Sequence, residues 1–378
     1  MLDVRQLLDE MVERDGSDLH LVVKDPPTVR VHGHLVRLEQ YGLLDKETTA
    51  DLVRQIIPER CVAELEEQRG VDFGFSYGDK ARFRVAVFYQ KETIAINMRL
   101  IPYKLRTFEE IGLDPNLRRL CHAPRGLVLV TGPTGSGKTT TLATMIDYIN
   151  THRDCHIITI EDPIEYYHQH KMSVVSQRQV GDDVPTFELG VIKALRQDPD
   201  VILVGEMRDL ATIAAAVRAA ETGHLVFSTL HTTGAVRTVD RIIDVFPFDQ
   251  QDQIRTQLSG NLVAVISQLL LPRPDGHGRS AAFEIMLCTP AIQHMIRDKK
   301  SHSIFTAIQT GHNFGMCTLD ESLIKLYRQG ELAKDEMLRV AEQPAEILQK
   351  LGEAVPDHLK GNGGSQPQAQ PQQGHPAR

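Results

Sequence analysis

The sequence predicts an α/β protein in which a smaller α+β part precedes a larger part built on a mainly parallel sheet. Three observations support this fold class. Residues 71–100 contain runs in which apolar and polar side chains alternate, as they do in half-buried strands. Residues 127–229 contain short apolar runs separated by amphipathic stretches, which is typical of alternating strands and helices. A glycine-rich segment that ends in Lys-Thr directly follows the first of these apolar runs.

The composition bounds the number of domains and the class of partner. The 378 residues suggest two or three domains. The chain carries 42 Lys and Arg against 50 Asp and Glu, so no overall basic footprint supports a nucleic-acid partner. The first residues are charged and amphipathic, unlike a signal peptide, and no apolar run approaches the length of a membrane span. We therefore expect a cytoplasmic protein that can still dock on a membrane complex.

The cysteines point to the same compartment. Five of them are spread far apart and form no C-x-x-C pair, so the sequence predicts neither a zinc site nor a disulfide framework. We expect reduced, mostly buried thiols.

Residues 1–100 predict one α+β domain. An amphipathic helix pattern covers 1–14, and Gly16-Ser17-Asp18 is expected to break it. In Arg82–Phe88 the apolar residues Phe83, Val85 and Val87 share one face, which leaves the arginines on the other. The expected strands and helices of this domain are strands 19–23, 28–31, 35–38, 71–77, 82–90 and 93–100, and helices 46–57 and 59–68.

Residues 107–351 predict the larger domain, joined to the first by a short linker over 101–106 in which Pro102 favours an extended chain. A helical C-terminal part runs from about 289 to 351. Residues 352–378 end in a Gln/Pro/Gly-rich tail that cannot bury a core and is expected to be disordered. The other expected elements are strands 127–131, 156–160, 201–205 and 225–229, and helices 138–150, 186–196, 209–221, 234–243 and 250–267.

The glycine-rich segment is a full match to G-x-x-x-x-G-K-[ST], with a strand before it and a helix after it. Its glycines let backbone N–H groups converge on phosphate oxygens, and the helix amino terminus adds a positive dipole end. Lys138 can reach the β- and γ-phosphates, and the Thr139 hydroxyl can ligate Mg²⁺. We therefore expect ATP and Mg²⁺ to bind. The predicted nucleotide-binding residues are Gly132, Pro133, Thr134, Gly135, Ser136, Gly137, Lys138, Thr139 and Thr140.

Two further apolar runs each deliver acids to the expected carboxyl end of a strand, the edge where ligands gather in open α/β sheets. Residues 157–160 lead into Glu161 and Asp162, and Glu161 could polarise an attacking water or touch the Mg²⁺ shell. Residues 200–204 lead through Gly205 into Glu206, which has the Walker B form and could hold Mg²⁺ through water or orient the nucleophile. The alternatives are an acidic turn in solvent and a buried strand with an exposed acid.

Histidines and arginines supply the remaining candidates. His224 and His231 flank the run 225–230, and either could sense a γ-phosphate or pair with a carboxylate. A P-loop often lacks charge on the far side of the γ-phosphate, and oligomeric ATPases can supply an arginine in trans. The candidates for that role are Arg82, Arg84 and Arg99, which lie on first-domain strands, and Arg196 and Arg208, which bracket the Walker B strand. Structural histidines and solvated arginines are the alternatives.

Six segments together carry a family resemblance: GSDLHL (16–21), ARFRVAVFYQ (81–90), GPTGSGKTTT (132–141), IEDPIEY (160–166), LRQDPDVILVGEMRD (195–209) and ETGHLVFSTLHTTGA (221–235). They resemble the secretion-superfamily ATPases and are most similar to the type IV pilus retraction ATPases of the PilT/PilU type. The resemblance implies a PAS-like N-terminal domain, a RecA-like P-loop NTPase domain and a homohexameric ring with ATP between subunits. It also implies pilin depolymerisation and twitching motility through an inner-membrane platform protein at the base of the pilus.

The resemblance assigns roles to the candidates. The 132–140 loop is Walker A, and Glu206 is the Walker B acid. Glu161, Asp162 and Glu165 match the family's Asp box, and His224 and His231 match its His box. Arg82, Arg84 and Arg99 match the segments from which trans arginines come. Residues 291–297, AIQHMIR, resemble the family's retraction motif but depart from it at Gln293 and His294.

Three alternatives stay open at this stage. Features such as residues 88–90 and 168–170 are PilU-like, which permits an accessory ATPase that acts on a paralogous partner ring. Pilus extension and type II secretion ATPases usually carry an extra N-terminal domain and a tetracysteine metal site. This sequence shows neither feature, which argues against an extension or secretion function. A nucleic-acid motor is disfavoured by the acidic balance. In the retraction reading, the 101–106 linker acts as a hinge between two half-domains.

Overall fold

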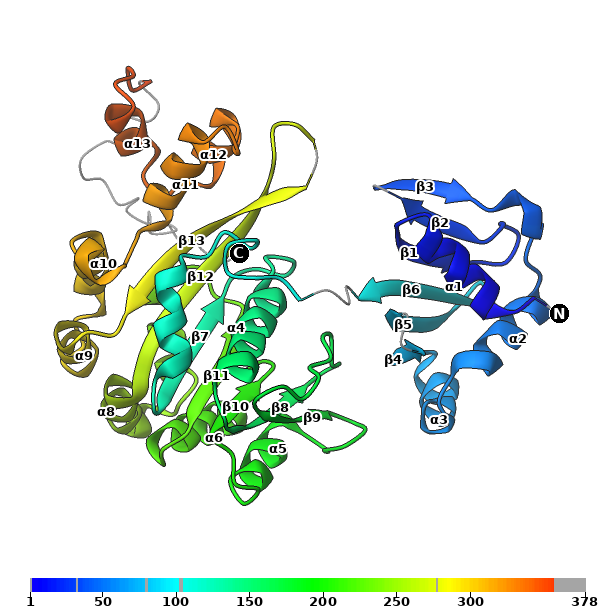
Figure 1. Ribbon diagram of the computed structural model, residues 1–378, viewed down its shortest axis with the longest axis horizontal. Coiled ribbons are helices and arrows are strands. Elements are labelled where there is room, and N and C mark those ends of the chain that lie inside the picture. The colour runs from blue at the N-terminus through cyan, green and yellow to red at the C-terminus, as the bar shows by residue number, and fades with distance from the viewer. Residues whose placement is uncertain (1, 32, 79–80, 102–104, 277, 357–378) are drawn as a thin grey trace, which may run out of the picture.

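The structure is a computed structural model that describes residues 2–31, 33–78, 81–101, 105–276 and 278–356. It contains two β-sheets, one of six strands and one of seven, each with its own hydrophobic core. The smaller sheet lies at the right of Figure 1 and the larger one at the left. The predicted fold class, a mixed α/β protein with two sheets, is confirmed.

The first sheet has the strand order β3-β2-β1-β6-β5-β4 and is antiparallel throughout. Its core forms between one face of the sheet and the apolar stripes of three helices. The alternation read from the sequence holds, since Phe83, Val85 and Val87 are buried and Arg84 is exposed. The elements are α1 (Val4–Glu13), β1 (Gly16–Leu21), β2 (Thr28–Val31), β3 (His34–Arg37), α2 (Lys46–Ile56), α3 (Glu59–Gln68), β4 (Gly70–Tyr77), β5 (Ala81–Gln90) and β6 (Thr93–Ile101).

One local prediction in this part is wrong. The first helix does end before Gly16, at Glu13, but the strand predicted to start at Leu19 already begins at Gly16. The glycine is needed there for packing: a Cβ at Gly16 would lie 2.5 Å from Cγ1 of Val29 on the neighbouring strand. A glycine in a strand can thus mark close approach rather than a break.

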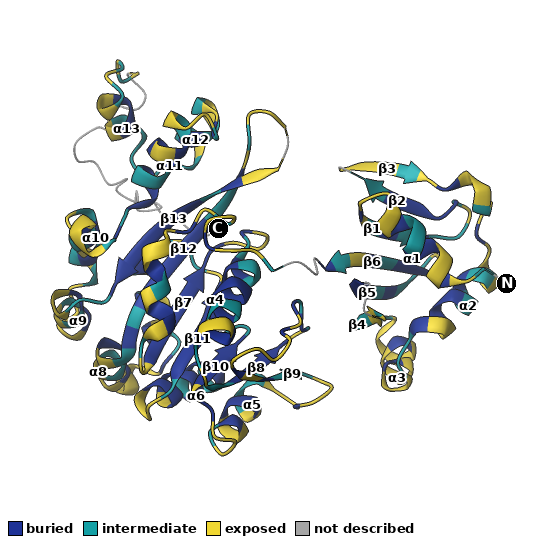
Figure 2. Ribbon diagram, in the orientation of Figure 1, coloured by how far each residue is buried: buried dark blue, intermediate teal, exposed yellow. Residues whose placement is uncertain are grey.

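The second sheet has the order β13-β12-β7-β11-β10-β8-β9. All neighbouring strands are parallel except β12 and β13, so the expected mainly parallel sheet is confirmed. The strands β7, β10 and β11 are buried along their whole length, as Figure 2 shows in dark blue. The strands are β7 (Gly126–Thr131), β8 (His156–Glu161), β9 (Val174–Gln179), β10 (Val201–Val204), β11 (Leu225–Leu230), β12 (Leu262–Pro272) and β13 (Arg279–Leu287).

The predicted helix over 250–267 is wrong in its second half. The helix α8 ends at Asn261, and the chain continues directly into β12. A continuous apolar run such as 262–266 reads equally well as a buried helix or a buried strand, because periodicity cannot separate the two. Here the run lies between β7 and β13, so tertiary pairing decides it. The sequence reading also missed β9 and β13 for lack of this context.

The helices of the larger part agree with the remaining predictions. They are α4 (Lys138–His152), α5 (Phe187–Ala194), α6 (Leu210–Glu221), α7 (Ala235–Asp244), α8 (Gln251–Asn261), α9 (Pro290–Arg297), α10 (Ile304–Gln309), α11 (Leu319–Arg328), α12 (Lys334–Val340) and α13 (Pro344–Lys350). The last three pack with the ends of β12 and β13 around a third apolar cluster. No helix in the described ranges is both long and apolar enough to span a membrane. Half of the expected linker, 102–104, and most of the expected tail, 357–378, lie outside the described residues.

Candidate nucleotide-binding site

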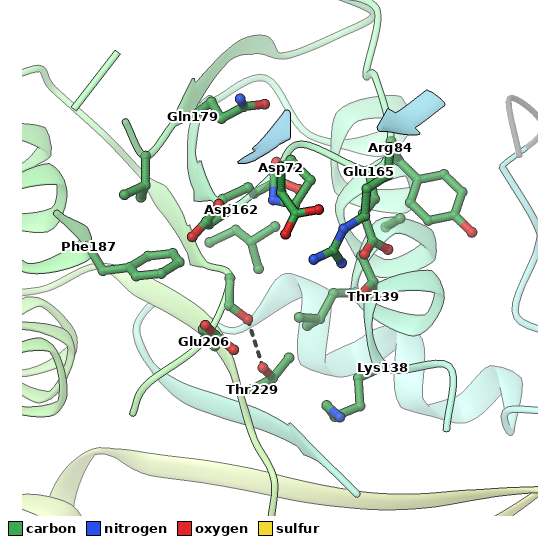
Figure 3. A pocket seen from close by; sticks show the side chains of 18 of the residues that line it. Asp72, Arg84, Lys138, Thr139, Asp162, Glu165, Gln179, Phe187, Glu206 and Thr229 are labelled. Atoms are coloured by element: carbon green, nitrogen blue, oxygen red, sulfur yellow. Dashed lines mark hydrogen bonds between the residues drawn. The ribbon is translucent and has the colours of Figure 1, made fainter. Parts of the chain in front are cut away.

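The candidate site lies at the carboxyl edge of the larger sheet. The parallel strands β7, β8, β10 and β11 all end there, so their following loops meet. These loops surround a cavity of about 550 Å³. Figure 3 shows side chains from both parts of the chain pointing into it. Of the predicted site residues, the cavity is lined by Thr134, Gly135, Lys138, Thr139, Glu161, Asp162, Glu165, Glu206, His231 and Arg84.

The P-loop adopts a conformation that only glycine allows at key positions. The φ angles are +142° at Gly132, +78° at Gly135 and +88° at Gly137. At Gly132 a side chain is also excluded by space, since a Cβ would lie 2.2 Å from the backbone oxygen of Gln268. The curled loop leads straight into α4, whose N-cap Gly137 makes no side-chain capping bond. The helix amino terminus is thereby left to an incoming anion.

Two polar groups of the loop fit a phosphate ligand. The Nζ of Lys138 donates to the backbone oxygens of Gly132 at 2.9 Å and Pro133 at 3.0 Å. Burial lowers the pKa of Lys138, and the charges of Glu206 and Glu165 oppose that shift. The Oγ of Ser136 is buried and has no hydrogen-bond partner in the structure. A buried hydroxyl without a partner is costly, and phosphate oxygens would satisfy it.

Side chains from two neighbouring elements brace the start of α4. The Thr141 hydroxyl donates to Oε1 of Gln268 on β12 at 2.7 Å. Thr140 Oγ1 lies 3.0 Å from the Tyr166 hydroxyl of the acidic loop that follows β8. Gln268 and Tyr166 were not singled out from the sequence, because a polar residue in an apolar strand or loop carries no signal of what it contacts.

Glu161 ends β8 and is buried. Its Oε1 accepts hydrogen bonds from the Thr159 hydroxyl at 2.6 Å and from Nε2 of Gln177 at 3.2 Å. Burial nevertheless dominates and raises the pKa of Glu161 to about 7. A carboxyl group that titrates near neutrality inside a cavity is suited to proton transfer or to orienting water.

Glu206 follows β10 and lies between the guanidinium of Arg208 and the imidazole of His231. Its Oε1 lies 2.8 Å from Nε of Arg208, and its Oε2 lies 3.6 Å from Nε2 of His231. The loop that carries it is fixed from β11, since the Thr229 hydroxyl donates to the Gly205 backbone oxygen at 2.7 Å (Figure 3). The sequence identifies Arg208 only as an arginine beside the Walker B strand. The structure places its guanidinium next to the Walker B acid, Glu206.

The three candidate arginines of the first sheet occupy different environments. Arg84 on β5 is exposed and lines the cavity. Arg82, two residues earlier, is only 8 % exposed and donates to the Ile164 backbone oxygen at 3.1 Å and to Oε1 of Gln179 at 3.1 Å. Arg99 lies outside the cavity, with its Nε 2.8 Å from a carboxylate oxygen of Asp18. Within one chain, only Arg84 of these three meets the site.

His224 is likewise not brought to the cavity. It precedes β11 at the amino end of the strand, and its Nδ1 lies 2.9 Å from the Ala219 backbone oxygen. Conversely, the cavity contains Asp72, Gln179 and Phe187, which the sequence had not suggested. Asp72 lies on an ordinary alternating strand, so only the approach of the two sheets could have pointed to it.

The arrangement can bind a nucleoside triphosphate and hydrolyse it. Lys138 and the P-loop line the same cavity as Glu161, Glu206 and His231, so phosphates bound by the loop would lie beside these two acids and this histidine. Thr139 and Glu206 supply hard oxygen ligands of the kind Mg²⁺ prefers. In the described part of the chain, no cluster of three or more His, Cys, Asp and Glu side chains is placed to hold a metal ion.

Comparisons with known proteins agree with this geometry. A family described as type II/IV secretion system protein matches residues 3–294. The type IV pilus retraction ATPase PilT of Pseudomonas aeruginosa is 46% identical over 343 residues, covering 91% of this chain and 99% of that protein. The type IV pilus ATPase PilU of the same organism is 40% identical over 361 residues, covering 95% and 94%. A crystal structure of the pilus retraction motor PilT with bound ADP superposes with a TM-score of 0.86 at 44% identity, covering 92% of this chain and 99% of that one.

Proposed function

Because the chain belongs to the type II/IV secretion system protein family and is an ATPase, we propose that it is a motor that retracts type IV pili. The observation that carries the proposal is the facing pair of Lys138 on the P-loop and Glu206 beyond β10, in a chain 46% identical to a pilus retraction ATPase along nearly its whole length. ATP hydrolysis would supply the work for pilin depolymerisation and hence for twitching motility.

In this proposal the P-loop residues Gly132 to Thr140 bind the triphosphate. The Lys138 ammonium exchanges the loop carbonyls for β- and γ-phosphate oxygens, which neutralises charge that develops in hydrolysis. Thr139 and Glu206 would hold Mg²⁺, Glu206 partly through water. The ion would bridge phosphate oxygens and offset their charge.

The water that attacks the γ-phosphate would be oriented by Glu161 or Glu206. Glu161 is buried and the pKa of its carboxyl group is raised to about 7, which suits it to accepting a proton. Glu206 is held by Arg208 and His231. His231 would act through Glu206, since its Nε2 faces that carboxylate. His224, at the opposite end of β11, would act in another way or only structurally.

The assembly we propose is a homohexameric ring with ATP between subunits. Arg84 faces the phosphates from its own first domain, and the exposed Arg99 is available to a neighbouring copy. Residues 1–100 and 107–351 would be the two half-domains, 101–106 the hinge between them and 352–378 a disordered tail. Rotation at the hinge would pass force to an inner-membrane platform protein at the base of the pilus.

A strain whose only copy of this protein carries Lys138→Ala tests this function. Without the ammonium the site loses its main phosphate cation, so we expect no turnover and no retraction of fluorescently labelled pili. The control is Lys193→Ala, at an exposed lysine of α5 that is not among the residues lining the cavity, and this strain should retract normally. Normal retraction in the Lys138→Ala strain would contradict the proposal.

A second candidate is an accessory retraction ATPase that acts on a paralogous ring. The 40% identity to PilU over 95% of the chain favours keeping it. The two candidates differ in what the purified chain does alone. An autonomous motor hydrolyses ATP without a partner, whereas an accessory subunit binds ATP and turns over substantially only when the partner ring is added.

A further inference from the structure

A buried carboxylate outside the cavity holds the loop that carries His231. Glu284 lies on β13 with only 3 % of its surface exposed. Its Oε1 accepts a hydrogen bond of 2.6 Å from the backbone N–H of Ala235, the first residue of α7. The N-cap of that helix, Gly234, makes no side-chain capping bond of its own. Glu284 therefore caps α7 from across the edge of the sheet.

The segment between β11 and α7 is short, which makes this contact consequential. Only residues 231–234 connect the end of β11 to the helix that Glu284 caps. Gly234 is fixed as well, because its N–H donates to Oγ of Ser267 on β12 at 2.8 Å. Its φ of +88° favours glycine, and a Cβ there would lie 3.6 Å from Oε1 of Glu284. The far end of the His231 loop is thus held by β12 and β13.

We propose that Glu284 is a positioning residue for hydrolysis, which fixes the 231–234 loop so that His231 stays against Glu206. The inference rests on the role proposed above for His231. Without the Glu284 acceptor, the first turn of α7 loses its cap and the loop gains freedom at its C-terminal end. The P-loop follows β7, the strand next to β11, and keeps its own braces from Gln268 and Tyr166.

Acidic side chains from the C-terminal part of the chain act electrostatically on the same carboxyl group. Asp320 of α11 and Glu342, which precedes α13, are the acidic groups whose charges act on it, and Arg237 of α7 is the basic one. Asp320 accepts hydrogen bonds from the backbone N–H groups of Glu342 at 2.8 Å and Gln343 at 2.9 Å. Burial, reinforced by the two acids, raises the pKa of Glu284 to about 7, against the opposing bond from Ala235 and charge of Arg237.

A double-mutant cycle tests the inference. Single-turnover ATP hydrolysis, with the hexamer in excess so that slow rates remain measurable, is compared in wild type, Glu284→Ala, His231→Ala and the double variant. We expect Glu284→Ala to lower the rate about tenfold in wild type and less than twofold in the His231→Ala background, with ATP affinity changed less than threefold. Equal losses in both backgrounds would overturn the inference, as would a wild-type rate in either single variant.

Two further variants separate positioning from a general loss of stability. Glu284→Gln keeps an oxygen acceptor for the Ala235 N–H and should stay within twofold of the wild-type rate, even if Glu284→Ala fails to fold. Glu331→Ala is the matched control. Glu331 accepts a hydrogen bond of 2.9 Å from Ser280, which lies on β13 as Glu284 does, but it makes no such bond to the 231–234 loop. A tenfold loss in Glu284→Gln or in Glu331→Ala would overturn the positioning role. These variants test only the positioning role of Glu284, and the Lys138→Ala strain tests the retraction function separately.

Discussion

The Nε2 atom of His231 lies 3.6 Å from Oε2 of Glu206, across the loop ends of two adjacent parallel strands. The other oxygen of that carboxylate is engaged by Arg208, so the Walker B acid is oriented from both sides. A carboxylate held in this way can keep its lone pairs directed at the phosphate side of the cavity.

We expect His231→Ala to lower the turnover number about tenfold to a hundredfold, the range found when a side chain that orients a metal-ligating group is removed. ATP affinity should change little, because the hydrogen bonds that fix Lys138 and Thr141 are made with other residues. The measurement is steady-state hydrolysis alongside equilibrium binding of a fluorescent ATP analogue. His224→Ala, at the amino end of the same strand, serves as the control and should keep most of its turnover. A similar loss in both variants would contradict a specific role for His231.

Glu161 should make the nucleotide-free protein less stable as the pH rises. The pKa of its carboxyl group is raised from 4.5 to about 7 by burial, so the folded chain holds a proton that the unfolded chain has released. Its stabilising contribution is full below pH 4.5 and is lost as the pH rises through 7. We expect the melting temperature of Glu161→Gln, relative to wild type, to be a few degrees higher at pH 8 than at pH 5.

The control for this titration is Glu165→Gln, which makes the same substitution at a half-buried position of the same cavity. Its melting temperature relative to wild type should vary less between pH 5 and pH 8. A flat difference for Glu161→Gln would mean that Glu161 is not the titrating group.

Two glycines of the P-loop should respond differently to alanine. Gly132→Ala places a Cβ 2.2 Å from a backbone oxygen, so the loop must move away from β12. Gly135→Ala meets nothing within 4 Å and carries only the left-handed backbone strain of about 1 kcal/mol. We expect ATP affinity to fall at least tenfold in Gly132→Ala and to a clearly smaller extent in Gly135→Ala, as measured by calorimetry. The reverse order would contradict this packing.

Arg82 and Arg84 should separate stability from catalysis. Truncating the buried Arg82 leaves the Ile164 backbone oxygen without this donor and removes one of the two donors to Oε1 of Gln179, at a cost of about 1–3 kcal/mol. Truncating the exposed Arg84 should leave the free energy of unfolding nearly unchanged while lowering kcat/KM for ATP. Denaturant unfolding and steady-state kinetics of Arg82→Ala and Arg84→Ala measure the two effects. Equal unfolding free energies would argue against a structural role for Arg82.

Much of the fold could be predicted from the sequence because local patterns and tertiary packing agree along most of the chain. The α4 helix and β7 strand flank a motif whose glycines have a single physical use, and β5 alternates cleanly. The boundary between α8 and β12 failed because the apolar residues after Asn261 are consistent with either state until β7 and β13 are placed beside them.

The candidate site was predictable where strands end in charged residues. Glu161 and Glu206 follow buried runs, so the shared edge of a parallel sheet brings them together. Asp72 and Glu284 could not be found in this way, since Asp72 lies on an alternating strand and Glu284 within a strand that is buried nearly throughout, and the partners of both are distant in sequence. The different surroundings of Arg82 and Arg84 also depend on packing: Arg82 lies over Gly74, where a Cβ would be 2.6 Å from its guanidinium.

Mg²⁺-dependent ATP hydrolysis by the purified chain, with Glu206→Ala alongside and the oligomer mass recorded in the same sample, tests the central claim most directly. We expect a hexamer that hydrolyses ATP alone and loses at least a hundredfold of that activity in Glu206→Ala, while ATP still binds. Undiminished hydrolysis by Glu206→Ala would contradict the site described for this motor, and binding without turnover by the wild-type chain would contradict an autonomous motor.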